Sequence, residues 1–142
     1  MRFWDSSALL SLLAGQRGGE RLKLLLQEDP DIVMWWATPV ELMSGASRLR
    51  RTGAADEETH SNIVIGIDEV VSEADQIDPG EQIRLAALRA VRTHDLRAAD
   101  ALQLAAALVW TGHEPLATGF VCLDKRLRDA AEREGFSVLP TS

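Results

Sequence analysis

Four acidic residues, Asp5, Glu41, Asp100 and Asp124, stand where a carboxylate could take part in chemistry. Acids that converge on one crevice without matching bases repel one another, and each raises the pKa of the others. A divalent cation removes that cost, and carboxylate oxygens select Mg²⁺ or Mn²⁺ rather than zinc or copper. Such a site suits hydrolysis of a phosphodiester, because the cation activates water and stabilises charge on the phosphate oxygens.

Two of these acids have an equally good structural explanation as helix caps. Asp5 comes before a predicted helix together with Ser6 and Ser7, and Asp and Ser are favoured at such positions. Asp124 stands between a predicted strand and a predicted helix, where an N-cap is again favoured. The sequence leaves a cap and a ligand open for both residues.

The other two acids differ in their local surroundings. Thr38 and Glu41 have the spacing of a capping box, which on local evidence outweighs a functional role for Glu41. Asp100 lies in a segment, 98–108, that is apolar nearly all round as a helix, which predicts that Asp100 is buried. Because a buried carboxylate needs a partner or a cation, Asp100 is a candidate ligand, with Arg97 as the structural alternative.

Predicted strands alternate with predicted helices, an order that favours a parallel sheet with helices on both faces. Binding crevices of such sheets lie at the carboxyl ends of the strands, where Asp5, Glu41 and Asp124 would meet. A helix is predicted over 56–78, because apolar residues recur there at helical intervals. The expected strands are 2–4, 32–36, 120–123 and 137–139, and the other expected helices are 7–14, 22–26, one that begins at 38–39, 83–91, 96–110 and 125–134.

Length and composition predict one domain over residues 1–142. The single cysteine, Cys122, excludes an internal disulfide framework, and three scattered histidines offer no helical pair for zinc. Asp5 stands where a signal peptide would have a cationic start, and the longest apolar stretch, 101–110, is too short to span a bilayer. A cytoplasmic protein with a reduced thiol and no membrane partner is therefore expected.

The formal net charge of −7 argues at first against a general nucleic-acid coat protein. The acidity is uneven, however: residues 56–78 hold eight acids and no Lys or Arg, which leaves 15 bases and 14 acids elsewhere. If four of those acids surround a cation, bases exceed acids on the remaining surface. The bases cluster at 48–51, 84–97 and 125–128, where they are most simply solvated helix faces, so the net charge does not argue against RNA.

Four segments of the sequence resemble the PIN-domain ribonucleases, and most of all the VapC toxins of bacterial toxin–antitoxin pairs. They are FWDSSAL (3–9), VEL (40–42), LRAADAL (96–102) and LDKRL (123–127), in this order along the whole chain. The resemblance implies a PIN-like three-layer α/β/α fold with a short, mainly parallel central sheet flanked by helices. It also implies an endoribonuclease that depends on Mg²⁺ or Mn²⁺, is inhibited by a cognate VapB-like antitoxin and forms a homodimer.

Matched to the family, Asp5, Glu41 and Asp100 would hold the catalytic cation, and Asp124 would complete the site or position water. The chain departs from the commonest family pattern at two places. Cys122 stands where Thr or Ser is frequent, so one hydroxyl contact is missing, and Gln103 replaces a frequent His. Neither change removes an acid, so rate or metal preference is affected more than activity itself.

The resemblance leaves the RNA contacts less defined. Ser6 is a candidate for substrate contact, with a helix cap as its alternative. Lys125 and Arg126 adjoin a proposed ligand and are expected to contact phosphate. Trp35 and Trp36 could stack bases but are interpreted as core residues of an apolar strand.

A different class of function stays open beside the nuclease. Glu41 and Asp124 could be caps alone, in which case the chain is a catalytically silent PIN-like module that binds RNA or protein. A phosphotransfer domain with Asp5 as nucleophile is a further alternative, but Ser7 occupies the place of its usual second acid. For the antitoxin, the helices predicted at 22–26 and 56–78 suggest a groove for a partner segment.

Overall fold

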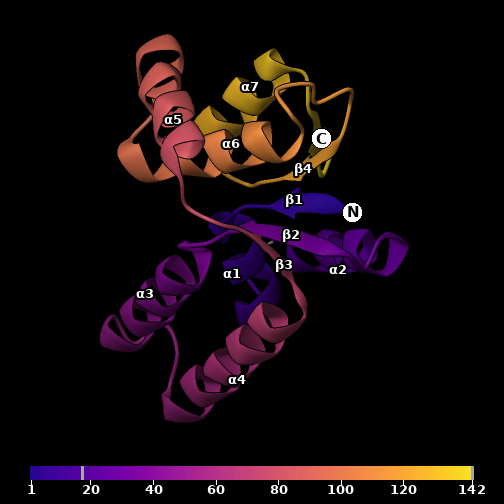
Figure 1. Cartoon of the computed structure of the whole chain (residues 1–142). Coiled ribbons are helices and arrows are strands. Elements are labelled where there is room, and N and C mark those ends of the chain that lie inside the picture. Colours follow the sequence, from indigo (N-terminus) through magenta and orange to yellow (C-terminus); the bar gives the residue numbers. More distant parts are fainter. Residues whose placement is uncertain (17, 142) are drawn as a thin grey trace.

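The computed structural model describes residues 1–16 and 18–141, and its centre is a sheet of five parallel strands (Figure 1). The order across the sheet is β3-β2-β1-β4-β5, so the N-terminal strand lies in the middle. In this register Phe3 of β1 lies opposite Val33 of β2 and Phe120 of β4. The strands are β1 (Arg2–Trp4), β2 (Ile32–Trp35), β3 (Asp75–Ile77), β4 (Gly119–Val121) and β5 (Ser137–Leu139).

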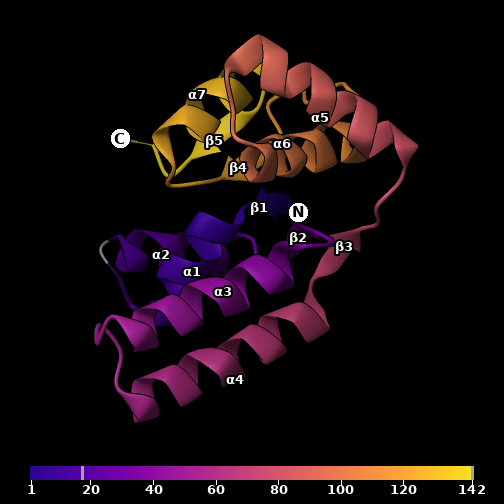
Figure 2. The ribbon, with the colours of Figure 1, turned by 90° about the vertical axis from the view of Figure 1, so that its left-hand side faces the viewer.

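Helices cover both faces of the sheet, with α1 to α4 on one side and α5 to α7 on the other (Figure 2). This arrangement confirms the predicted three-layer α/β/α fold. Among the described residues, no helix combines the length and the apolar character needed to cross a membrane. The helices are α1 (Ser6–Ala14), α2 (Gly19–Glu28), α3 (Thr38–Arg51), α4 (Glu57–Glu73), α5 (Glu81–His94), α6 (Ala98–Trp110) and α7 (Lys125–Glu134).

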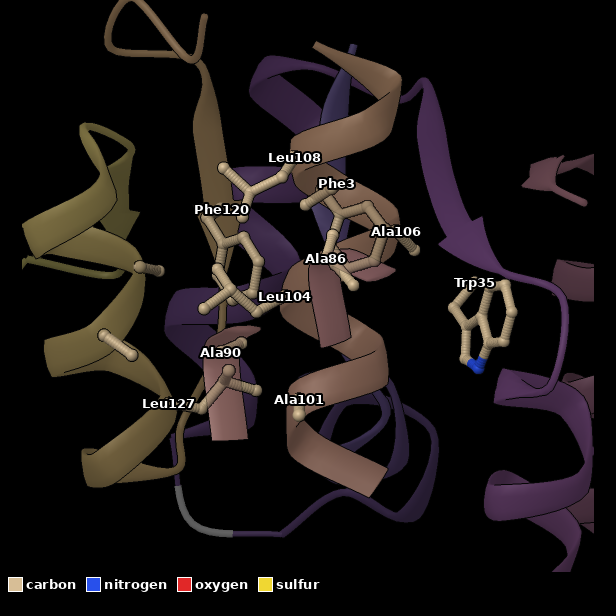
Figure 3. Close-up of a cluster of buried hydrophobic side chains, with 14 of the residues drawn as sticks. Phe3, Trp35, Ala86, Ala90, Ala101, Leu104, Ala106, Leu108, Phe120 and Leu127 are labelled. Carbon is tan, nitrogen blue, oxygen red and sulfur yellow. The ribbon is translucent and has the colours of Figure 1, made fainter. Parts of the chain in front are cut away.

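Each face of the sheet carries its own hydrophobic core, because successive strand residues point to opposite sides. Trp4 and Val121 belong to the core under α1 to α4, whereas Phe3 and Phe120 belong to the core under α5 to α7. The rings of Phe3 and Phe120 stack with their centroids 5.2 Å apart. Figure 3 draws both side chains in this core. The short strands are thus held by large side chains on both faces.

Residues 56–78 form a helix and a strand rather than the single helix that the periodicity predicts. Asp56 caps α4 by accepting a hydrogen bond from the Thr59 N–H at 2.8 Å, and the helix ends at Glu73. Ala74 has an extended backbone, and Asp75–Ile77 then pair with β2 as the edge strand β3. The helical prediction was wrong there, because pairing with a distant strand determines the structure of these residues and local spacing does not report it.

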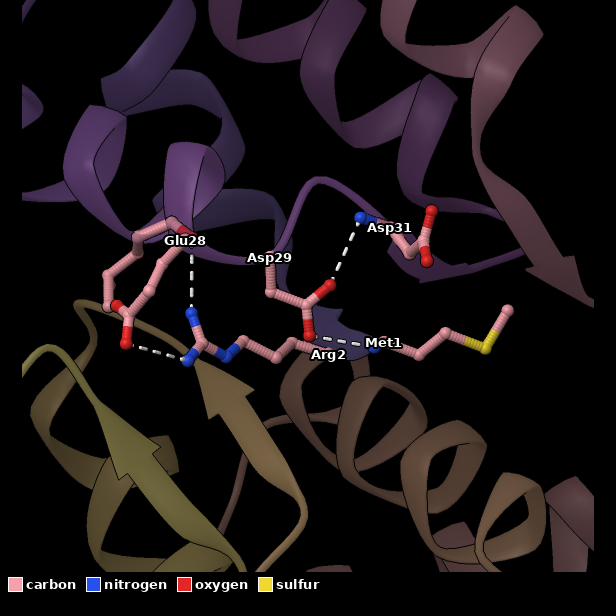
Figure 4. A network of polar contacts seen from close by, with 6 residues as sticks. Met1, Arg2, Glu28, Asp29 and Asp31 are labelled. Carbon is pink, nitrogen blue, oxygen red and sulfur yellow. Dashed lines mark hydrogen bonds and ion pairs between the residues drawn. The ribbon is translucent and has the colours of Figure 1, made fainter.

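The chain start is fastened to the end of α2 by a small polar network (Figure 4). The N-terminal ammonium of Met1 lies 2.7 Å from Asp29 Oδ2, and the Arg2 guanidinium donates to the carbonyl of Leu25 at 3.1 Å. Arg2 also lies 3.6 Å from a carboxylate oxygen of Glu28. Partly exposed pairs of this kind contribute little to stability, so the network mainly orients the first strand.

Glu134 at the end of α7 connects this helix to α5. His94 Nε2 lies 2.6 Å and an Arg89 nitrogen 3.2 Å from the same Glu134 carboxylate oxygen. Burial opposes ionisation of Glu134, but the hydrogen bonds from His94 and Arg89 outweigh it and lower the pKa of this carboxyl. His94 therefore faces Glu134. The residues that follow His94 form the loop between α5 and α6.

Glu134→Gln is expected to lower the free energy of unfolding at pH 7 by about 1–2 kcal/mol. The pKa of Glu134 is lower in the folded state than its usual 4.5. Its ionised form therefore stabilises the fold fully at pH values above 4.5. This stabilisation is lost as the pH falls through the folded pKa. Urea unfolding at pH 7 and pH 3 tests this, with the exposed neighbour Glu132→Gln as control. An equal difference between wild type and Glu134→Gln at both pH values would contradict it.

Candidate active site

All four acids predicted as ligands line one open cleft of about 440 Å³, called the acid cleft below. It lies where the carboxyl ends of β1, β2 and β4 lead into helices, as expected for a parallel sheet. Each acid comes from the start of a different helix, where the backbone dipole favours negative charge. The lining residues are Asp5, Ser6, Ser7, Leu10, Val40, Glu41, Ser44, Gly45, Arg48, Asp100 and Asp124.

Asp5 is the most buried of the four, with 2% of its surface exposed. It accepts hydrogen bonds from the Ala8 N–H at 3.0 Å, from Ser7 Oγ at 2.8 Å and from the Cys122 thiol at 3.4 Å. Burial raises its pKa from 3.8 to about 6, although these hydrogen bonds favour the ionised form. Asp5 is thus both the N-cap of α1 and a wall of the acid cleft.

Asp124 combines the same two roles. Its carboxylate accepts from the Leu127 N–H at 3.0 Å and so caps α7, while the residue also lines the acid cleft. β4 ends at Val121, so Asp124 follows a short connection rather than the strand itself. The cap interpretation of both Asp5 and Asp124 is confirmed, and it does not exclude a second role.

Asp100 is only half-buried, which corrects the expectation that it lies in the apolar interior. It occupies the first turn of α6, and this turn borders the acid cleft. Desolvation raises its pKa, the negative charges of Asp124 and Glu41 raise it further, and Arg97 partly offsets both. The repulsion expected among converging acids is therefore present.

The capping box predicted for Glu41 is wrong. Ala37 is the N-cap of α3 and makes no side-chain cap, so Thr38 is already inside the helix. Glu41 instead accepts from Ser6 Oγ at 2.7 Å through Oε2 and from Gln103 Nε2 at 3.1 Å through Oε1. Ser6 accordingly does not cap α1 but holds Glu41 at the acid cleft.

A glycine permits this contact between α1 and α3. A Cβ atom on Gly45 would lie 2.5 Å from Leu10 Cδ2, so any larger residue would require the Leu10 side chain to move. The close approach of the two helices brings Ser6 within hydrogen-bond distance of Glu41. The sequence indicates a special role for Gly45 only by placing a glycine inside a helical pattern.

Ser7 Oγ and the Cys122 thiol both donate to Asp5 and lie 4.0 Å from each other. Ser7 Oγ donates to Asp5 and accepts from the Leu123 N–H at 3.1 Å, which links the start of α1 to the connection after β4. Burial raises the pKa of the Cys122 thiol, so the group stays protonated beside Asp5. Sequence reasoning missed Ser7, because its position predicts a cap and not a bridge to a distant segment.

The cations near the acid cleft differ from those expected. Lys125 is exposed and pairs with Asp129 at 3.2 Å, and Arg126 lines a separate pocket with His94 and Asp95. Neither residue is among those that line the acid cleft. Arg48 does line it, seven residues after Glu41 on the same face of α3.

The two tryptophans divide between core and surface. Trp35 is buried as expected, but Trp36 is 54% exposed, so its interpretation as a core residue was wrong. The reason is that β2 ends at Trp35, and the chain turns into α3 directly after it.

The chemistry of the donor set suits a divalent cation, because four carboxylates share one cleft and the pKa values of two are raised. Within residues 1–16 and 18–141, no group of three or more Asp, Glu, His or Cys side chains stands ready to hold a metal ion. Asp5, Glu41 and Asp124 point to hydrogen-bond donors of the protein. An ionised carboxylate has about four lone-pair sites, so each of these side chains can accept its hydrogen bonds and still offer an oxygen to an ion.

Comparison with known proteins places the chain in a family. Residues 2–133 match the model of the PIN domain. No curated protein matches the sequence. The chain is similar in structure to a toxin–antitoxin complex from Klebsiella pneumoniae, with a TM-score of 0.66, 18% identity, and 99% of this chain and 97% of that chain covered.

Two further solved structures have the same fold. The crystal structure of FitAcB from Neisseria gonorrhoeae has a TM-score of 0.66 and 16% identity, and covers 99% of this chain and 97% of that one. FitAB bound to an IR36 DNA fragment has a TM-score of 0.64 and 15% identity, over 98% of this chain and 94% of that one. With the family model matched over nearly the whole length, and acids from four helices gathered at the carboxyl edge of a parallel sheet, the chain belongs to the PIN-domain family.

Proposed function

We propose that this PIN domain is a Mg²⁺- or Mn²⁺-dependent endoribonuclease and acts as the toxin of a toxin–antitoxin pair. The observation that carries the enzymatic part is the acid cleft, in which Asp5, Glu41, Asp100 and Asp124 meet although the chain separates them widely. An open cleft with this charge has no evident structural purpose, since the repulsion it contains costs stability.

Asp5, Glu41 and Asp100 would hold the cation, and Asp124 would complete the site or position the attacking water. A bound Mg²⁺ or Mn²⁺ supplies charge stabilisation at the phosphate and activates water. The protein holds the acids in place through Ser6, Ser7, Gln103 and the caps of α1 and α7. Metal binding also offsets the mutual repulsion of the carboxylates.

The test of this function is cleavage of a mixed cellular RNA pool by the purified protein with Mg²⁺, Mn²⁺ or EDTA. Asp100→Asn removes a half-buried ligand charge with little change of shape and is expected to abolish cleavage. Cleavage that persists in this variant, or that never occurs with either metal, contradicts the nuclease. The second result favours the alternative, a catalytically silent PIN-like module that binds RNA or protein.

Arg48 is the cation best placed to hold RNA at the acid cleft. Arg48→Ala is expected to weaken binding of a non-cleavable RNA about fivefold, and to reduce the salt dependence of binding by roughly one phosphate contact. Binding titrations with the Asp100→Asn protein as background measure both quantities. Arg50→Ala, an exposed arginine on α3 that does not line the cleft, is the control, and an equal loss in both variants would contradict a local contact.

Ser6, Lys125 and Arg126 stay predictions as substrate contacts. Ser6 lines the acid cleft, which supports it. Lys125 and Arg126 follow Asp124 in the sequence, but Lys125 pairs with Asp129 and Arg126 lines another pocket. A contact with either would therefore involve RNA that extends beyond the acid cleft.

An antitoxin is the proposed protein partner, because two of the similar structures are described as toxin–antitoxin or FitAB assemblies. A cleft between α2, β2 and α4 provides an apolar floor with two acids, Glu69 and Glu73, at its border. This cleft supports the partner groove suggested by the helices at 22–26 and 56–78, and it suits an apolar segment with basic residues. Co-purification with the product of a neighbouring gene tests the pairing.

A homodimer and a cytoplasmic location complete the proposal. Leu85, Leu88 and Val91 form an exposed apolar stripe on α5, which a second copy of the chain could cover. The single buried thiol, Cys122, suits a reducing compartment. Light scattering of the purified chain measures the oligomeric state directly.

A further inference from the structure

We propose that Gln103 is a positioning residue for Glu41, an inference that rests on the proposed function. Its side-chain amide holds one carboxylate oxygen of Glu41 while the Ser6 hydroxyl holds the other. Together they fix the direction in which this carboxylate enters the acid cleft and therefore how well the cleft binds a divalent cation.

Three helices meet at the Glu41 side chain. Gln103 Nε2, from α6, donates to Glu41 Oε1 at 3.1 Å, and Ser6 Oγ, from α1, donates to Oε2 at 2.7 Å. Gln103 Nε2 also donates to Thr38 Oγ1 at 3.0 Å, one turn before Glu41 on α3. The amide thus has two side-chain partners on α3, the Thr38 hydroxyl in its first turn and the Glu41 carboxylate.

Gln103 is fully buried in a helix whose other inward residues are apolar, and its position alone does not explain a polar side chain. Within the described part of the chain its Oε1 atom is buried without a hydrogen-bond partner. Leaving a buried carbonyl unpaired is unfavourable, so a residue chosen for packing alone would be Leu or Met. The contribution of Gln103 therefore lies in its two donated hydrogen bonds.

The orientation of the amide follows from the chemistry of Glu41. An ionised carboxylate only accepts hydrogen bonds, so the amide must present Nε2 to it and leave Oε1 unpaired. A glutamate side chain has several rotatable bonds, and ordering them on binding an ion costs conformational entropy. Gln103 and Ser6 impose this order before the ion arrives. Residues that orient a metal ligand in this way commonly change metal affinity by one to two orders of magnitude.

The test is the affinity of the full chain for Mn²⁺ alone, measured by calorimetry or by the paramagnetic resonance of free Mn²⁺. Gln103→Met keeps the volume and removes the donor, and it is expected to raise the Mn²⁺ Kd roughly tenfold. Gln103→His retains a donor and is expected to remain within about threefold of wild type. Melting temperatures of both variants verify that they are folded.

A double-mutant cycle separates positioning from a merely structural role. In a Glu41→Gln background, Gln103→Met is expected to leave the Mn²⁺ Kd unchanged, because the residue acts through Glu41. An equal loss of affinity in both backgrounds, or an unchanged Kd for Gln103→Met in the wild-type background, overturns the proposal.

The failure of the nuclease and the failure of this inference are distinguishable. A wild-type chain that binds Mn²⁺ but cleaves no RNA would contradict the proposed function, whereas the affinity cycle would still decide the role of Gln103. A wild-type chain that binds no Mn²⁺ would overturn both.

Discussion

Asp5→Asn is expected to abolish RNA cleavage, by a factor of roughly 10³ or more, and at the same time to stabilise the metal-free protein. The loss follows because Asp5 lies deepest in the acid cleft and Asn removes the charge that would attract the cation. The gain follows because burial makes the ionised form of Asp5 unfavourable and Asn, which is neutral, keeps an acceptor for the Ala8 N–H.

The expected gain depends on pH in a defined direction. The pKa of Asp5 is raised from 3.8 to about 6 on folding, so the folded state binds the proton more tightly than the unfolded state. The wild-type protein therefore loses stability as the pH rises from about 4 to 6 and stays at the lower level above it. At pH 7.5 the free energy of unfolding of Asp5→Asn is expected to exceed that of wild type by on the order of 1–3 kcal/mol, and this difference disappears below pH 4.

Thermal unfolding in EDTA at pH 4 and pH 7.5, paired with an RNA cleavage assay, checks both effects. Asp68→Asn, an exposed acid of α4 outside the cleft, is the matched control and should change neither. Adding Mn²⁺ should raise the melting temperature of wild type but not of Asp5→Asn. A variant that is inactive and also less stable at pH 7.5 would show that the hydrogen bonds of Asp5, and not its buried charge, dominate.

Phe120→Ala is expected to lower the free energy of unfolding by about 3–5 kcal/mol, a large share of the stability of a domain of this size. Phe120 is fully buried on β4. Its ring centroid lies 5.2 Å from that of Phe3, on which it stacks, and 5.3 Å from that of Phe136. Removing the ring leaves a cavity between β1, β4 and the helices that cover them. Urea unfolding monitored by circular dichroism measures the loss.

Two further variants calibrate that measurement. Phe120→Leu retains most of the apolar volume and should lose about half as much or less. Leu116→Ala removes a side chain that is 84% exposed and should change stability by less than about 0.5 kcal/mol. A Phe120→Ala variant as stable as Leu116→Ala would contradict the cavity argument.

Local patterns were sufficient to predict most of the fold, since apolar spacing and the positions of Gly, Pro and caps mark where helices begin and end. The exception was the segment 75–77, whose strand pairing with β2 depends on residues about forty positions earlier. The family match confirms the PIN prediction, while the extent of the domain over 1–142 and the roles of the site residues stay predictions.

The site was harder to predict, because its geometry depends on contacts between distant segments. A cap uses one carboxylate oxygen, so Asp5 and Asp124 can cap and still face the cleft, which sequence spacing cannot reveal. Glu41 had the spacing of a capping box, yet its partners are Ser6 and Gln103, 35 and 62 positions away. The burial of an acid likewise depends on which segments pack around the start of its helix. Asp5, and not Asp100, is therefore the deeply buried acid.

The central place of β1 has a consequence for the protein during its synthesis. β1 is translated before the other four strands of its sheet, but its partner β4 and the thiol that contacts Asp5 come 117 positions later. Arg128 donates to the carbonyls of Cys122 and Pro140, at 2.7 Å each, and so joins the connection that carries Asp124 to the segment after β5. A nascent chain therefore cannot assemble the acid cleft until the segment that carries Cys122 and Asp124 has been translated, well over a hundred positions after β1.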